Sequence, residues 1–97
     1  MRTYTSLRDL IVNTGATLVE EKFQPEGFGS ARVLFSARDG TQFRLVWDGK
    51  ECCGFLQSLN ANGAWGDEIP FVRERMGGEF SNLPEFTETA KLLARRT

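Results

Sequence analysis

The sequence predicts an α+β fold: an N-terminal helix, a four-stranded antiparallel meander sheet with an optional fifth strand, and a C-terminal helix packed on the sheet. Two Asp-Gly turns separate three strand-like runs in the centre of the chain, and such turns are a strong signal of β-hairpins. Helix-start signals flank this centre on both sides. With 97 residues, 40% of them hydrophobic and 26% charged, residues 1–97 are expected to form one domain.

The first helix is expected at about residues 6–14, because start and stop signals bracket one apolar stripe. Ser6 can cap the helix, and Asp9 favours the positive end of the helix dipole. Gly15 is typical of the left-handed residue that follows the last helical turn. The stripe has helical spacing and consists of Leu7, Leu10 and Ile11.

The next segment, residues 17–23, fits either a strand or a continued helix. The strand is favoured because Gly15 stops the helix and Thr17 is β-branched. A loop is expected at residues 24–29, where one proline and two glycines fall close together.

Three strands are expected in the centre of the chain, at residues 31–37, 41–47 and 51–59. Three-residue loops in both hairpins would place Phe43 opposite Phe35 and opposite Phe55, as an aromatic row on one face. Two-residue loops would place core residues opposite polar ones, so the three-residue register is preferred. The predicted core face then carries the odd-numbered residues Val33, Phe35, Phe43, Leu45, Trp47, Cys53, Phe55 and Leu59.

The last third of the chain begins with a turn at residues 60–63. A short, irregular strand is expected within 64–72, and Pro70 confines it to the edge of the sheet. Residues 73–79 are expected to form a charged loop or a single helical turn.

The second helix is expected to start at residues 81–85. Ser81 or Asn82 can cap it, and Pro84 suits its first turn. Its inward stripe is predicted to consist of Phe86, Thr89, Ala90 and Leu93.

The even-numbered face of the central strands mixes apolar residues with arginines and serines, whereas a solvated face is mostly polar. Two interpretations remain open. The first helix or the C-terminal loop covers part of this face, or the face binds another protein or a second copy of the chain. Its predicted members are Arg32, Leu34, Ser36, Arg44, Val46, Cys52, Leu56 and Ser58.

The charge balance gives no strong case for binding nucleic acid or an anionic membrane, because the net charge is −1. The N-terminal residues are polar, and no apolar run reaches the length of a signal peptide or a membrane span. The sequence therefore predicts a cytoplasmic protein without a membrane partner.

Catalysis is not expected, because the chain contains no histidine to activate a nucleophile. The acidic pairs Asp48 with Glu51 and Asp67 with Glu68 fall in predicted turns, where neighbouring acids are rarely catalytic. No cofactor is expected. A small ligand-binding domain that uses arginines and carboxylates remains a third alternative.

The two cysteines, Cys52 and Cys53, are adjacent in sequence. In a strand, neighbouring side chains point to opposite faces, so these thiols are badly placed to form a bridge. They are expected to be reduced and partly buried. Two thiolates without histidine fall short of the four ligands of a zinc site, so no metal is expected.

Five residues are predicted to contact a partner protein, on the basis of interface chemistry. Arginine and tryptophan are frequent hot spots of protein interfaces, and acidic loop residues can face a basic site on another protein. The candidates on the sheet face and its loops are Arg32, Arg44, Trp65, Asp67 and Glu68.

Residues 19–30 and 43–50 resemble a pattern found in small bacterial proteins. In these proteins an N-terminal helix leads to an extended segment of the form EEEF.PE.FG and then to a strand of the form R.V.D. Some of them are similar to immunity proteins of bacterial toxin systems. The resemblance covers residues 7–60 and implies a stoichiometric binder that blocks an enzyme or toxin without a cofactor. The alternative is a homodimer or larger homo-oligomer with a structural or regulatory role.

Overall fold

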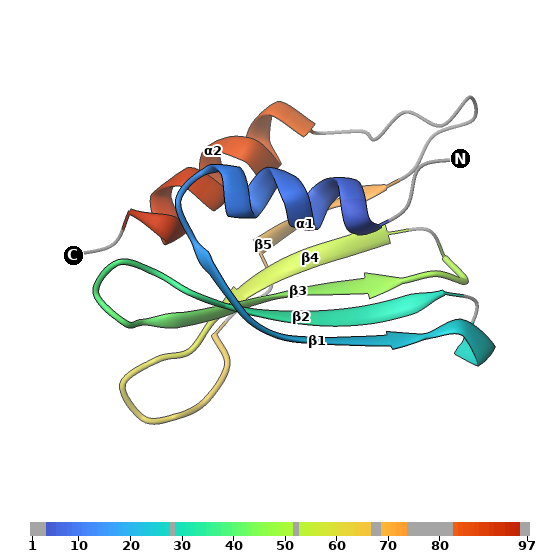
Figure 1. The fold of residues 1–97 in the computed structure, drawn as a ribbon, viewed down its shortest axis with the longest axis horizontal. Helices are drawn as coiled ribbons and strands as arrows, with labels where there is room; N and C mark the ends of the chain where they lie inside the picture. Colours follow the sequence, from blue (N-terminus) through green and yellow to red (C-terminus); the bar gives the residue numbers. More distant parts are fainter. Residues whose placement is uncertain (1–3, 28, 52, 67–68, 74–82, 96–97) are drawn as a thin grey trace.

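The computed structural model describes residues 4–27, 29–51, 53–66, 69–73 and 83–95. Five strands form one antiparallel sheet in the order β1-β2-β3-β4-β5, and the two helices lie on the same face of it (Figure 1). The α+β prediction is confirmed, and the optional fifth strand is present. The elements are α1 (Tyr4–Asn13), β1 (Thr17–Gln24), a short 3-10 helix (Pro25–Gly27), β2 (Ser30–Ser36), β3 (Gln42–Asp48), β4 (Cys53–Ser58), β5 (Ile69–Arg73) and α2 (Leu83–Ala94).

Helix α1 begins at Tyr4, earlier than the predicted start at Ser6. The reason is that the buried ring of Tyr4 extends the apolar stripe of Leu7 and Ile11 by one further turn. The prediction that Ser6 caps the helix is therefore wrong, since Ser6 is an exposed residue inside α1. Gly15 ends the helix as predicted, with a φ of +113° and its N–H bonded to the Val12 carbonyl at 3.0 Å.

Residues 17–24 form strand β1, so the strand interpretation is confirmed. This strand lies at one edge of the sheet, and β2 is its one partner among the described strands. The pairing shifts register between Leu18 and Glu20, which places Glu21 opposite Val33 and Lys22 opposite Arg32. Glu21 therefore faces the helices, whereas Lys22 faces the other side of the sheet.

The first hairpin has the predicted three-residue loop. Phe35 lies opposite Phe43, their rings stack with centroids 5.3 Å apart, and Ala37 N–H donates to the Thr41 carbonyl at 2.8 Å. Gly40 has a φ of +87°, as the left-handed position of this loop requires.

The second hairpin contradicts the predicted register. Asp48 pairs with Cys53, so the loop lies between these two residues and Leu45 lies opposite Leu56. The longer turn is stabilised by the Asp48 carboxylate, whose Oδ1 accepts the backbone N–H groups of Lys50 and Glu51.

This shift reverses the two faces of β4 relative to the prediction. Leu56 is fully buried in the core, whereas Cys53 and Phe55 are half-buried and belong to the opposite face. Packing explains the choice, because Gly54 lies under the buried ring of Trp47, where a side chain has no room. Cys52 lies outside the described residues.

The core fills the space between the sheet and both helices. The idea that α1 covers the even-numbered face is wrong, because α1 and α2 pack on the same side (Figure 1). In α2, Phe86, Ala90 and Leu93 point inward as predicted, Thr89 is half-buried, and Leu92 is 74% exposed. The buried hydrophobic residues are Tyr4, Leu7, Ile11, Ala16, Ala31, Val33, Phe35, Ala37, Phe43, Leu45, Trp47, Leu56, Phe86, Ala90, Leu93 and Ala94.

The end of the chain agrees with its predicted outline. Residues 60–63 form the expected turn, and β5 is an edge strand that contains Pro70 and pairs with β4. The predicted caps Ser81 and Asn82 lie outside the described residues, as do 74–79 of the predicted charged loop.

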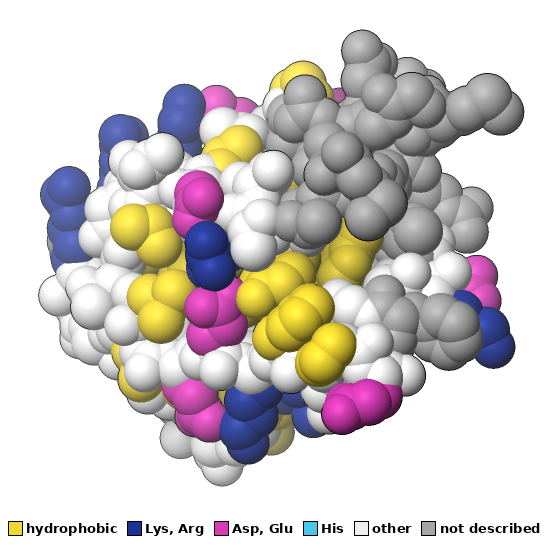
Figure 2. Space-filling model, turned by 45° about the vertical axis from the view of Figure 1, so that its right-hand side comes forward, with side chains coloured by type: hydrophobic (Ala, Val, Ile, Leu, Met, Phe, Trp, Pro, Cys, Tyr) yellow, Lys and Arg dark blue, Asp and Glu magenta, His cyan; other side chains and the backbone are white. Residues whose placement is uncertain are grey.

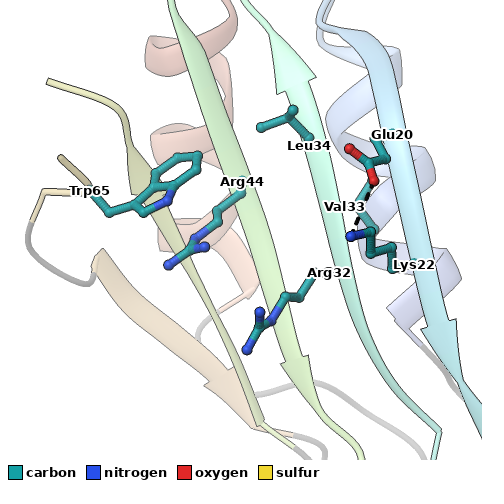
Figure 3. Close-up of a pocket in the computed structure, with 7 residues that line it drawn as sticks. All are labelled: Glu20, Lys22, Arg32, Val33, Leu34, Arg44 and Trp65. Carbon is teal, nitrogen blue, oxygen red and sulfur yellow. Dashed lines mark ion pairs between the residues drawn. The ribbon is translucent and has the colours of Figure 1, made fainter. Parts of the chain in front are cut away.

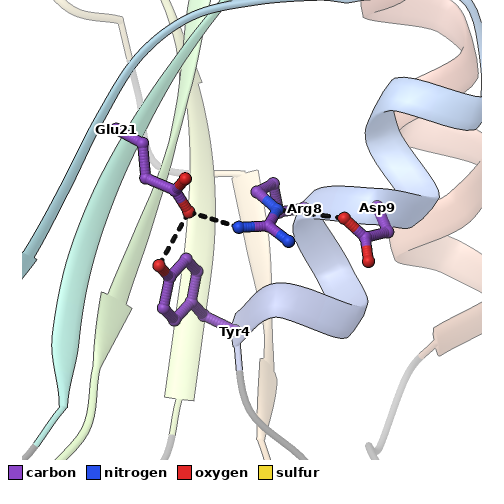
Figure 4. A network of polar contacts seen from close by, with 4 residues as sticks. All are labelled: Tyr4, Arg8, Asp9 and Glu21. Atoms are coloured by element: carbon purple, nitrogen blue, oxygen red, sulfur yellow. Dashed lines mark hydrogen bonds and ion pairs between the residues drawn. The ribbon is translucent and has the colours of Figure 1, made fainter.

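A polar network joins α1 to β1 at the rim of the core (Figure 4). Tyr4 Oη and Arg8 Nη1 both donate to Glu21 Oε2, each at 2.7 Å, and Arg8 Nε donates to Asp9 at 3.0 Å. Burial, reinforced by Glu21, raises the pKa of Tyr4 to about 12. Burial alone would raise the pKa of Glu21, but the hydrogen bonds from Tyr4 and Arg8 outweigh it and lower that pKa.

The lowered pKa of Glu21 predicts an acid-sensitive link between α1 and β1. A carboxyl group with a depressed pKa stabilises the fold above its unfolded pKa, and this contribution is lost as pH falls through the folded pKa. We expect Glu21→Gln to lower the free energy of unfolding by about 1–2 kcal/mol at neutral pH. Urea unfolding across the acid range should show this difference from the wild type shrinking toward zero.

Glu20→Gln is the matched control for this experiment. Glu20 lies next in the chain, 54% exposed at its side chain, and pairs with Lys22 at 3.5 Å. Exposed pairs of this kind contribute less than about 1 kcal/mol. An acid profile of Glu21→Gln identical to that of the wild type would contradict the network's role.

Candidate functional site

The open face of the sheet is defined as the face opposite the helices. Its central residues are the half-buried Leu34, Val46 and Phe55, together with Arg32 and Arg44. Among the described segments, no helix lies against it, and the loop 59–66 covers part of it through Trp65. The mixed polar and apolar character predicted for this face thus belongs to a surface that no described helix covers.

A cleft of about 200 Å³ crosses the open face from β1 to β3 (Figure 3). Glu20 and Lys22 stand on one side, Arg44 and Trp65 stand on the other, and Arg32 extends between them. Neighbouring strands are about 4.8 Å apart, so the two sides, two strands from each other, are separated by about 10 Å. The cleft also has Leu34 on its floor.

Arg44 is held in place by two contacts before any partner arrives. Its guanidinium stacks on the indole of Trp65, with Cζ 4.1 Å from the ring centroid. Its Nε and Nη2 donate to Gln57 Oε1 at 3.1 and 2.8 Å, and Gln57 Nε2 donates to the Gly66 carbonyl at 3.0 Å. Sheet and loop therefore fix one orientation of the guanidinium.

The loop places Trp65 by continuing the β4 strand into a small hairpin. Leu59 and Trp65 form an isolated antiparallel bridge. The turn between them is organised by Asn60, whose Oδ1 accepts the N–H groups of Asn62 and Ala64, each at 3.0 Å. Gly63 completes the turn with a φ of +81°, which a residue with a side chain rarely adopts.

The charges of this cleft are unbalanced. Among the described residues, it contains three cationic side chains, and the one carboxylate, Glu20, already pairs with Lys22 at 3.5 Å. Within the described part of the chain, Arg32 makes no hydrogen bond or ion pair, and the hydrogen-bond acceptor of Arg44 is the neutral amide of Gln57. Burial and the nearby charge of Arg32 lower the pKa of Arg44.

A second hollow of about 410 Å³ adjoins the cleft and shares Lys22 and Arg32 with it. It continues toward the turn between β3 and β4, past Val46 to Asp48. The Asp48 carboxylate at its far end is engaged by the backbone of the turn. The two hollows together form a groove along the strands.

The structure brings together three of the five predicted interface residues, since Arg32, Arg44 and Trp65 all line the cleft. Asp67 and Glu68 lie outside the described residues, so their part in an interface stays a prediction.

Sequence reasoning missed three further participants in this site. Gln57 was missed because the predicted register of β4 did not place it opposite Arg44. Glu20 and Lys22 were missed because the register shift in β1 decides which face they occupy. The sequence shows a Glu-Glu-Lys run at residues 20–22, but it does not indicate which face of the sheet each side chain occupies.

A different surface also combines hydrophobic and charged groups. Yellow hydrophobic side chains alternate with magenta and blue ones across the middle of Figure 2. On edge strand β1, Leu18, Val19 and Phe23 are 39%, 48% and 53% exposed. Phe23 stacks on Tyr4 with ring centroids 5.7 Å apart.

The described residues contain no cluster of three or more metal-ligating side chains of the His, Cys, Asp or Glu type. In the same part of the chain, neither helix is long and apolar enough to cross a membrane. No family model matches the chain, and no curated protein or solved structure is significantly similar to it.

Proposed function

We propose that this chain is a non-enzymatic protein-binding module that docks on another protein through its open face. In this proposal it acts as a stoichiometric inhibitor of the immunity type, because residues 19–30 and 43–50 resemble a pattern in small bacterial proteins, some of which are similar to immunity proteins of toxin systems. The observation that carries the proposal is the prearranged stack of Trp65 on Arg44, beside half-buried apolar residues and an Arg32 that has no polar partner among the described residues.

The chemistry of this face suits a protein partner. Interfaces are enriched in tryptophan and arginine, and fixed side chains lose less conformational entropy when they bind. Leu34 and Val46 supply apolar area that a partner can bury next to these anchors. A partner that covers the face would add a third layer to the helix–sheet sandwich.

The experiment is an affinity capture from the host's own lysate, followed by reconstitution with the purified prey. We expect a complex of one chain with one prey molecule in isothermal titration calorimetry. The Trp65→Ala/Arg44→Ala variant should weaken this complex at least about a hundredfold, the loss expected for two central anchors. A prey that is an enzyme should lose its activity at one equivalent.

Leu92→Ala/Arg95→Ala is the matched control, because it removes an exposed leucine and an exposed arginine from the helical side of the molecule. It should leave the complex unchanged. Thermal unfolding of both double variants checks that neither has lost the fold. Equal affinities of the two variants would contradict docking through the open face.

The exposed edge strand favours a second candidate function, a homo-oligomer. The outer side of β1 carries no neighbouring strand in the described sheet, and Leu18, Val19 and Phe23 are exposed along it. Edge strands of this kind can pair with a second copy. In that case light scattering should show a dimer that Val19→Lys dissociates, whereas the inhibitor proposal expects a monomer in the absence of the prey.

A further inference from the structure

We infer that the cleft on the open face is a carboxylate-binding subsite, which takes a glutamate or aspartate side chain from an extended acidic segment of the partner protein. The inference rests on the proposed protein-binding function and specifies the chemistry of the partner. Three observations carry it. Neither arginine has a carboxylate partner among the described residues, Arg44 is held in one position, and the groove is extended along the strands.

Among the described residues, the two arginines of the cleft have no carboxylate as a partner. Arg32 has no polar partner in the described part of the chain, and the acceptor that faces the Arg44 guanidinium is an uncharged amide. The remaining cation, Lys22, already faces Glu20. An incoming carboxylate would therefore find at least one guanidinium with all of its donors available.

Two guanidinium groups on the same side of the sheet repel each other, which costs electrostatic free energy. Arg44 is half-buried and loses hydration, and Arg32 extends on the same side of the sheet (Figure 3). Burial first, and then repulsion from the like charge of Arg32, lower the pKa of Arg44. A bound anion between them would turn this repulsion into two attractive interactions.

The Arg44 guanidinium is oriented before a ligand binds. Trp65 and Gln57 hold Arg44 from two sides, and Gln57 is itself tied to the Gly66 carbonyl. Hot-spot arginines bind tightly when their orientation is set in advance, because little rotamer entropy is lost on binding.

The shape and polarity of the groove favour an extended protein segment over nucleic acid. The second hollow continues the cleft along the strand direction and shares Lys22 and Arg32 with it. Leu34 and Val46 can pack against the methylene groups of a glutamate. Nucleobases need an aromatic surface to stack on, but Arg44 already occupies one face of the Trp65 ring.

The experiment uses a synthetic peptide of alternating glutamate and valine as the probe. The same peptide with glutamine in place of glutamate is the control for charge, and inorganic phosphate and a single-stranded oligonucleotide are controls for other anions. The readout is the set of NMR signals from the Arg32 and Arg44 Nε–H groups and the Trp65 indole N–H. Each probe is titrated into the millimolar range.

We expect the glutamate peptide to shift these three signals, and its affinity to fall with added salt. Arg32→Ala should weaken it about tenfold. Arg44→Lys keeps the charge but loses the planar fork and the stack, so it should weaken binding nearly as much as Arg44→Ala. The control variant Arg95→Ala should leave the titration unchanged.

Three results would overturn the inference. The glutamine peptide binds as tightly as the glutamate peptide, phosphate or the oligonucleotide binds more tightly at the same signals, or the glutamate peptide shifts no signal. These results differ from a failure of the proposed function. The glutamate peptide can fail to bind while the affinity for the purified prey still depends on Trp65 and Arg44. That result would support the protein-binding function and contradict the carboxylate subsite.

Discussion

Leu56→Ala is expected to lower the free energy of unfolding by about 2–5 kcal/mol, one of the largest effects of any leucine truncation in this chain. Leu56 has no exposed surface and lies opposite Leu45, at the centre of the core. Its truncation removes buried methyl groups and leaves a cavity that the neighbouring strands cannot fill. Urea or guanidinium denaturation measures the loss directly.

Leu34→Ala is the matched control, since it makes the same chemical change on the open face. Leu34 is half-buried and lies opposite Arg44, so its loss should cost less than half as much. Phe55→Ala tests the hairpin register from the other side. In the register predicted from sequence, Phe55 would be a core residue. A larger loss of unfolding free energy for Phe55→Ala than for Leu56→Ala would therefore contradict the observed pairing.

Gly54→Ala is expected to destabilise the fold by about 1–3 kcal/mol, although it adds a single methyl group. A Cβ at Gly54 would lie 2.9 Å from Cε3 of Trp47 and 3.0 Å from the carbonyl oxygen of Val46. The indole is buried in the core and the carbonyl belongs to the central strand, so neither can move away easily. Thermal unfolding monitored by circular dichroism provides the measurement.

Gly66→Ala serves as the control for the glycine substitution. Its added Cβ would approach the Ser58 carbonyl at 3.4 Å, an ordinary contact distance, and its φ is not positive. Such a replacement is close to neutral, or stabilises by up to about 1 kcal/mol through the unfolded state. A similar loss for both variants would show that the Trp47–Gly54 contact does not limit packing.

Local sequence signals predict the structure correctly where a feature depends only on residues that are neighbours in sequence. The positive φ of Gly15 and Gly40, the register of Phe35 with Phe43 and the edge position of Pro70 all follow from short-range rules. The start of α1 did not follow from such rules. Tyr4 joins the helix because its ring is buried, and burial is a tertiary property.

The second hairpin shows where local rules fail. The Asp48-Gly49 pair indicates a turn but not its length. The length is decided by the contact of Trp47 with Gly54, which requires strands that are already paired. The extra loop residue moves Leu56 into the core, so the sequence-based assignment of that leucine to the open face was wrong.

The candidate site divides in the same way. Residue chemistry alone selected Arg32, Arg44 and Trp65, because these residue types are frequent at protein interfaces. Only the tertiary structure placed them around one cleft and supplied Gln57 as the support of Arg44. Positions from three strands and a loop meet there, and their distance in sequence hides this from any local pattern.

The sequence by itself thus determined the α+β class, the order of the elements and the first hairpin, and it named three residues that line the candidate cleft. Tertiary structure decided which face each residue of β4 occupies and that both helices pack on one side of the sheet. The physical reason is that turn and helix signals act over a few residues, whereas register and layer packing depend on how buried side chains fit together across the whole core.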